Sequence, residues 1–153
     1  IAKAFHANGK MMYVRDGKYM SKDFKQYISD MPGKPPKDEA TTKRWIESVE
    51  VSGNIAVAKI ILQFSHGKAV DYFTLLKTDD EWKITNKVFY YAPKSADGFS
   101  MNSSEMEAIK TPLNNYLMND KTDDPAYAKK AFHTVGDLQW ISKGKFRVSL
   151  ANR

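Results

Sequence analysis

The chain has 153 residues, a net charge of +6, a hydrophobic share of 42% and no cysteine. A chain of this length and composition can fold into one good core, or into one core and part of a second. The lack of cysteine excludes disulfide bridges and thiolate metal sites. The composition fits a cytoplasmic protein, which is the default expectation, and also an exported bacterial one.

The basic residues are mostly lysines spread between apolar positions, as at Lys83 and Lys87. Nucleic-acid readers usually cluster arginine and lysine beside exposed aromatic residues, so we expect no nucleic-acid partner. No apolar run approaches the roughly 18 residues that indicate a membrane span, so we expect no membrane partner either.

The first predicted elements are a β-hairpin and a short helix. The hairpin covers residues 11–14 and 18–20 and turns at Asp16-Gly17, a dipeptide that tolerates positive φ. The helix starts with Ser21 as its N-cap. Its apolar side chains recur at helical spacing: Phe24, Tyr27, Ile28 and Met31.

Four antiparallel strands are predicted next, at residues 43–51, 55–64, 68–77 and 82–91. Short turns separate them, so they form a meander. A meander preceded by a helix predicts an α+β domain, with helices on one face of a curved antiparallel sheet.

A second helical region follows a linker at residues 99–103. Ser104 and Glu107 match a capping box, and the helix that they start contains Pro112, where we expect a kink. Asp124-Pro125 starts another helix, and residues 138–141 are predicted to form a strand.

The end of the chain repeats its beginning. Ala4-Phe5-His6 matches Ala131-Phe132-His133, and the same offset of 127 residues brings Gly17 onto Gly144. An offset of this size is a domain-sized period. We therefore expect residues 1–98 to form a first unit without its N-terminal helix. Residues 104–153 would hold the opening helices and first strand of a second unit, which could also complete the first one.

Several motifs together resemble the family described as "putative lumazine-binding", which belongs to the nuclear transport factor two-like superfamily. The motifs are Ala4-Phe5-His6, Asp16-Gly17-Lys18 and residues 53–58, 71–77 and 82–90. The resemblance implies a cone-shaped α+β fold, in which a strongly curved antiparallel sheet wraps over three helices around a central pocket. It also implies homodimers, formed through the sheet face or by helix exchange.

Asp71 is the sharpest candidate for chemistry. A carboxylate inside an apolar strand is expensive to bury, so it either lies on a wet face or has a task. If it points into the cone, it could pair with His6 for acid–base catalysis, as the resemblance to cyclases and dehydratases of the superfamily implies. The alternative is an aspartate that holds a backbone N–H or a lysine such as Lys87 across the sheet. His6 and its repeat equivalent His133 are expected at helix C-termini, where a cation is favourable.

A pocket suited to a flat-ring small molecule has six candidate lining residues: Tyr13, Tyr27, Trp45, Tyr72, Asn86 and Tyr90. Trp82 is a further aromatic candidate for its wall. The aromatic members fit core packing equally well. His66 is expected to face solvent in a tight turn, and three dispersed histidines make no metal site. There is no phosphate loop or nucleophile elbow, so we expect no cofactor.

These features favour a non-catalytic small-molecule-binding or assembly module with a hydrophobic pocket. The alternative is a cofactor-independent isomerase, dehydratase or cyclase that uses Asp71 with His6. A third class, a protein–protein scaffold, is favoured if side chains fill the cone.

Overall fold

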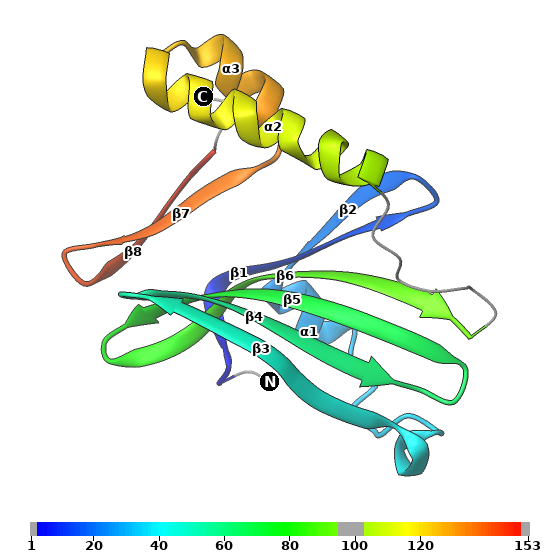
Figure 1. The fold of residues 1–153 in the computed structure, drawn as a ribbon. Helices are drawn as coiled ribbons and strands as arrows, with labels where there is room; N and C mark the ends of the chain where they lie inside the picture. The colour runs from blue at the N-terminus through cyan, green and yellow to red at the C-terminus, as the bar shows by residue number, and fades with distance from the viewer. Residues whose placement is uncertain (1–2, 95–102, 151–153) are drawn as a thin grey trace. The chain divides into compact units, whose positions relative to one another are not determined.

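The protein divides into two units in a computed structural model that describes residues 3–94 and 103–150 (Figure 1). Unit 1 is Ile1–Asp97 and unit 2 is Gly98–Arg153. The elements of unit 1 are β1 (Phe5–Arg15), β2 (Lys18–Asp23), α1 (Phe24–Ser29), a 3-10 turn η1 (Glu39–Thr41), β3 (Lys43–Ser52), β4 (Ile55–Gln63), β5 (Gly67–Thr78) and β6 (Glu81–Pro93). The elements of unit 2 are α2 (Ser103–Thr122), α3 (Pro125–Ala131), β7 (Asp137–Ser142) and β8 (Lys145–Leu150).

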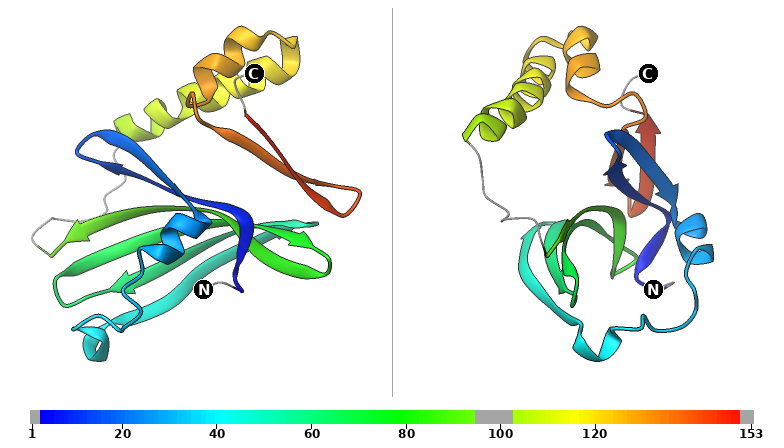
Figure 2. Two further views of the ribbon diagram at one scale, coloured as in Figure 1. Left: turned by 180° about the vertical axis from the view of Figure 1, so that it is seen from behind. Right: turned by 90° about the vertical axis from the view of Figure 1, so that its right-hand side faces the viewer.

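The strands of unit 1 form one six-stranded sheet in the order β2-β1-β6-β5-β4-β3. Strands β3 to β6 are the predicted antiparallel meander, and the sheet that contains them is curved (Figure 2). Strand β1 extends this sheet by pairing in parallel with β6. The predicted α+β class with a curved, mainly antiparallel sheet is confirmed. The parallel pairing joins distant parts of the chain, so local patterns could not predict it.

Two of the tight turns use residues in the left-handed region of φ. At the β1–β2 turn, Asp16 and Gly17 have φ of 50° and 71°. At the β5–β6 turn, Asp79 and Asp80 have φ of 49° and 64°. Glycine adopts this region without steric cost, and aspartate tolerates it better than most residues. The turn residues therefore hold the register of both hairpins.

Helix α1 begins later than the sequence predicts, and Ser21 is not its N-cap. The cap is Asp23, whose Oδ1 accepts a hydrogen bond from the backbone N–H of Gln26 at 2.8 Å. Strand β2 continues to Asp23, and Ser21 pairs with Met12 within it. The strand pairing takes precedence over the local capping preference of Ser21.

The buried apolar side chains of unit 1 come from β1, β4 and β5: Phe5, Met11, Tyr13, Ala56, Ile61, Ala69, Val70, Phe73 and Leu76. Phe5 stacks on Phe24 of α1 with ring centroids 5.3 Å apart, which fixes the helix to β1. Burying one such side chain contributes about 1.5–3 kcal/mol. Strand β3, in contrast, is exposed along its whole length.

The β7–β8 hairpin of unit 2 has the same geometry as the β1–β2 hairpin of unit 1. The pairs from Asp137↔Leu150 to Ser142↔Lys145 lie 127 residues beyond the pairs from Lys10↔Asp23 to Arg15↔Lys18. The turn residues Lys143 and Gly144 have φ of 52° and 72°, close to the values at Asp16 and Gly17. The two hairpins thus share register and turn conformation, although β1 begins at Phe5, before the position that corresponds to the start of β7.

Candidate ligand-binding site

Strand register divides the sheet of unit 1 into two faces. Residues that pair directly across strands point to the same face, so Ala58, Phe73, Lys87 and Met11 carry one face from β4 to β1. The ring of Tyr27 on α1 lies 5.9 Å from Lys87 Nζ, so this is the face on which α1 packs. We call it the α1 face.

A buried ion pair lies on the α1 face. Asp71 Oδ2 is 2.7 Å from Lys87 Nζ, and the two side chains are 6% and 15% exposed. The Lys87 ammonium also lies 5.4–5.9 Å from the ring centroids of Tyr27, Phe73 and Phe89. Rings at this distance attract a cation through their π faces and keep water away from it. Asp71 therefore has the lysine partner that the sequence offered as the alternative to a catalytic task.

The α1 face also forms an apolar hollow of about 280 Å³. Its lining residues are Ile46, Val49, Val51, Ala56, Ala58, Ile60, Phe73, Leu75, Trp82 and Ile84. Phe73 is both a wall of the hollow and one of the rings around Lys87. The hollow therefore has apolar walls, and a charged pair lies beyond one of them.

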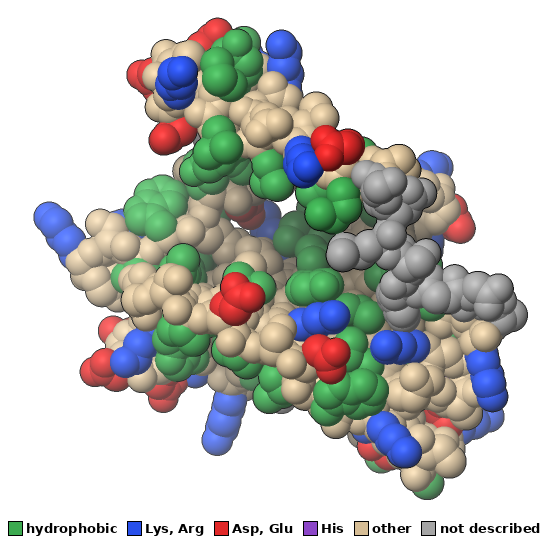
Figure 3. Space-filling view, viewed as in Figure 1, with side chains coloured by type: hydrophobic (Ala, Val, Ile, Leu, Met, Phe, Trp, Pro, Cys, Tyr) green, Lys and Arg blue, Asp and Glu red, His purple; other side chains and the backbone are tan. Residues whose placement is uncertain are grey.

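Large apolar side chains of the hollow remain in contact with solvent. Ile46 is 66% exposed, Val49 54% and Val51 60%. Figure 3, which views the sheet from the side away from α1, shows further hydrophobic side chains at the surface between scattered charged ones. Exposed apolar surface that lines a hollow favours binding of an apolar partner, because covering it removes that surface from water.

A second cleft, of about 650 Å³, opens where β1 and β6 separate. The two strands are paired as far as Met12 and Val88, after which each pairs only with its other neighbour, β2 or β5. We call this space the β1/β6 cleft. It is lined by Met12, Tyr13, Val14, Arg15, Tyr19, Val88, Phe89, Tyr90 and Tyr91.

The six predicted ligand-binding residues do not gather in one place. Tyr27 and Tyr13 lie with the α1 face, because Tyr27 approaches Lys87 and the ring of Tyr13 packs against that of Phe89. The register places the other four on the opposite face of the sheet: Trp45, Tyr72, Asn86 and Tyr90. Tyr13 and Tyr90 line the β1/β6 cleft, and none of the six lines the apolar hollow. The further aromatic candidate, Trp82, does line the hollow.

His6 lies in β1 and not at a helix end, so that expectation was wrong. At this point β1 runs beside Ile84 of β6. Asp71 pairs with Phe89 of β6. Phe89 lies roughly 16 Å beyond Ile84 along the strand, at about 3.3 Å per residue. The structure therefore does not bring His6 to Asp71 as an acid–base pair. Burial, and secondarily the charge of Lys83, lowers the pKa of His6 below its ordinary value of 6.5.

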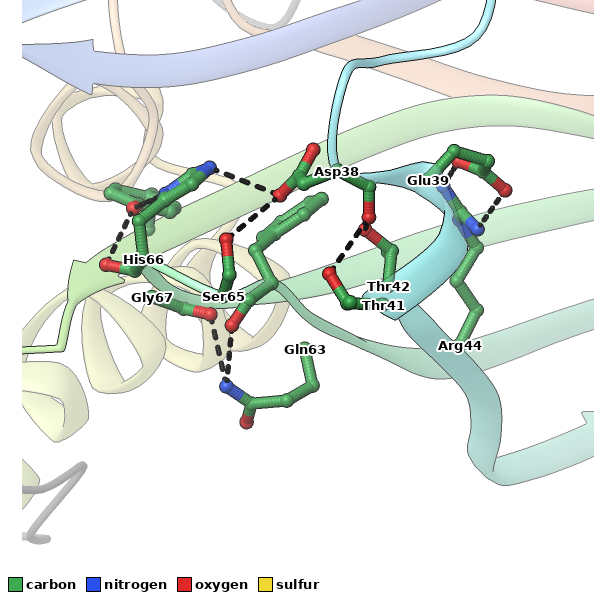
Figure 4. A network of polar contacts seen from close by, with 11 residues as sticks. Asp38, Glu39, Thr41, Thr42, Arg44, Gln63, Ser65, His66 and Gly67 are labelled. Atoms are coloured by element: carbon green, nitrogen blue, oxygen red, sulfur yellow. Dashed lines mark hydrogen bonds and ion pairs between the residues drawn. The ribbon is translucent and has the colours of Figure 1, made fainter.

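A polar network around His66 is the feature that the sequence analysis missed (Figure 4). His66 Nδ1 is 2.5 Å from Tyr91 Oη, and its Nε2 is 3.5 Å from Asp38 Oδ2. The imidazole stacks on Phe64, although its side chain is 63% exposed as expected for a turn. A Cβ at Gly67 would overlap Tyr91 Oη, so only glycine lets Tyr91 pack here. A glycine directly after a turn histidine was the available signal.

Neither a metal centre nor a membrane helix is found in the part of the chain that the structure describes. No three His, Asp or Glu side chains gather there in a way that could hold a metal ion. No helix there is both long and apolar enough to cross a membrane. The chemistry that the α1 face offers is apolar contact beside one buried carboxylate–ammonium pair.

Comparison with known families assigns the chain. The family model described as "Putative lumazine-binding" matches residues 1–90. The chain belongs to this family. The matched residues contain the whole of β1 to β5 and most of β6, so the family's features correspond to unit 1. A comparison with curated proteins gave no significant match.

Solved structures support the same fold. An NTF2-like protein of unknown function from Shewanella baltica OS155 is 23% identical, with a TM-score of 0.52 over 60% of this chain and 75% of that one. A second NTF2-like protein of unknown function, from Methylobacillus flagellatus KT, is 26% identical, with a TM-score of 0.50 over 60% of this chain and 73% of that one. The fold of the chain is therefore NTF2-like, as the sequence predicted.

Proposed function

We propose that unit 1 is a non-catalytic module that binds a small, flat-ring molecule in the apolar hollow of the α1 face. The observation that carries the proposal is the hollow itself, whose walls are apolar and whose member Phe73 also contacts Lys87. Ligand pockets are typically apolar cavities with a few polar groups that fix orientation. Membership in the family described as "Putative lumazine-binding" and the NTF2-like fold support a pocket-forming module.

The Asp71–Lys87 pair gives the proposed site its polar end. Both side chains are nearly buried, and a polar ligand group placed beside them would exchange hydrogen bonds in a poorly hydrated setting. An apolar ring would fill the hollow, while this pair would select its orientation. A catalytic use of Asp71 with His6 finds no support in the strand register, which keeps the two apart.

A thermal-shift screen with pterin, flavin and steroid-like rings tests the proposal. A ligand at about 100 times its Kd stabilises the protein by about 2.7 kcal/mol, which raises the Tm of a domain of this size by roughly 10 °C or more. We expect at least one ring class to raise the Tm. No shift with any of them would contradict the proposal.

A matched pair of variants locates the binding. Ala58→Phe fills the hollow and should abolish the shift, because Ala58 lines it. Val57→Phe introduces the same side chain at the neighbouring residue, which is 49% exposed and points to the opposite face, and should keep the shift. Loss in both variants, or in neither, would place the ligand elsewhere.

We also propose that unit 2 is the opening of a second copy of unit 1. The equal register and turn conformation of the two hairpins support this proposal. Gly17 and Gly144 both have positive φ and no atom near a would-be Cβ, so alanine at either position should cost about 1–2 kcal/mol locally. Clearly different local costs, measured by hydrogen exchange in each hairpin, would argue against equivalence.

A further inference from the structure

The β1/β6 cleft has the size and shape of a ligand site that is separate from the apolar hollow. Its volume of about 650 Å³ lies within the roughly 300–1,000 Å³ of typical ligand pockets. It exists because β1 and β6 stop pairing after Met12 and Val88 while β2 and β5 continue to hold them on their other sides. The opening is therefore part of the sheet topology and does not depend on a loop conformation.

The aromatic walls of the cleft are fixed by their own contacts. Tyr13 is 8% exposed and packs against Phe89 with ring centroids 5.1 Å apart. Tyr91 is held through its hydroxyl by His66, which is tied in turn to Asp38. Side chains that are held in place before binding lose little conformational entropy when a ligand arrives. These rings are consequently suited to stack on a planar ligand.

The charge of the cleft is positive. The Arg15 guanidinium lies 5.3 Å from the centroid of the Tyr13 ring, and no carboxylate of the described residues forms an ion pair with it. Lys22 is close by: its pKa is raised chiefly by its hydrogen bond to Asp30, while the charge of Arg15 acts in the opposite direction. The Asp30 carboxylate forms an ion pair with the Lys22 ammonium. The guanidinium of Arg15 is therefore the cation of the cleft that can receive an anionic ligand.

We propose that the β1/β6 cleft binds a planar aromatic carboxylate. The ring stacks on the tyrosines, and the carboxylate accepts hydrogen bonds from the Arg15 guanidinium, whose planar fork matches a carboxylate with two parallel bonds. This site is independent of the proposed ligand in the apolar hollow, because the two sets of lining residues do not overlap.

The test is calorimetric titration of the full chain with 2-naphthoate and with the neutral 2-naphthamide. We expect saturable binding of 2-naphthoate that weakens with added salt, and much weaker binding of the amide. Arg15→Gln should weaken 2-naphthoate binding by about 10- to 100-fold, the usual range for a charge-assisted hydrogen bond. It should leave amide binding unchanged.

Lys18→Gln is the matched control, because Lys18 pairs with Arg15 in the hairpin but does not line the cleft. It should bind 2-naphthoate as the unaltered chain does. Equal loss in the two variants, or no saturable binding, would overturn the proposal. A dimer that Tyr90→Ala dissociates, found by sedimentation together with absent 2-naphthoate binding, would also overturn it and assign the cleft to contact between copies.

Discussion

Replacing Lys87 with methionine should destabilise unit 1 strongly. Methionine retains most of the length of the lysine side chain but leaves Asp71, whose side chain is 6% exposed, without its partner at 2.7 Å. Removing one member of a buried ion pair typically costs about 3–5 kcal/mol, because the remaining charge is buried and uncompensated. With an m-value of about 1.5 kcal/mol/M, a loss of 3 kcal/mol lowers the urea midpoint by about 2 M.

Two further variants separate this cause from others. Lys77→Met makes the same change in β5, where Lys77 forms an ion pair with Asp80. The side chains of this pair are 41% and 100% exposed, so the variant should lose less than about 1 kcal/mol of unfolding free energy. The double variant Asp71→Leu with Lys87→Met removes both charges and should recover most of the lost stability. Unfolding of Lys87→Met at the same urea concentration as Lys77→Met would contradict a stabilising buried ion pair. A double variant as unstable as Lys87→Met would contradict the uncompensated charge of Asp71 as the cause.

Two other changes test the polar contacts. Gly67→Ala forces a Cβ against Tyr91 Oη and the Ala92 carbonyl oxygen, so it should cost about 1–3 kcal/mol of unfolding free energy; an unchanged thermal midpoint would show that Tyr91 does not pack there. His6 binds its proton less readily in the folded state than in the unfolded state, because burial and Lys83 lower its pKa. Stability should therefore fall as the pH drops below about 6.5, and His6→Gln should reduce this fall. Equal pH profiles for the two proteins would contradict the burial of His6.

The meander was predictable because each strand carries its own alternating pattern and each turn its own aspartate or glycine. The bounds of β3, β4, β5 and β6 differ from the predicted ranges by at most a few residues. The Asp71–Lys87 contact was also within reach, since a lysine two positions from the cross-strand partner is near enough to pair diagonally.

The site could not be predicted to the same degree, because β5 buries residues on both faces. Val70 and Phe73 point in opposite directions and are both buried, so alternation did not show which face holds the hollow. Trp45 and Tyr72 were assigned to the pocket for their chemistry, and the register places them on the other face. His6 was assigned to a helix because local patterns do not show pairing with distant strands. Its strand β1 pairs in parallel with β6, about 80 positions away in the sequence.

Ligand binding on the α1 face can be tested directly with tryptophan fluorescence. The chain has three tryptophans: Trp82 lines the hollow, Trp45 lies on the opposite face, and Trp140 lies in unit 2. Two single-tryptophan variants, one retaining Trp82 and one retaining Trp45, are titrated with whichever ring raises the Tm. Binding in the apolar hollow predicts saturable quenching or a spectral shift of Trp82 fluorescence and no change in Trp45 fluorescence. A response at Trp45 with none at Trp82 would contradict it.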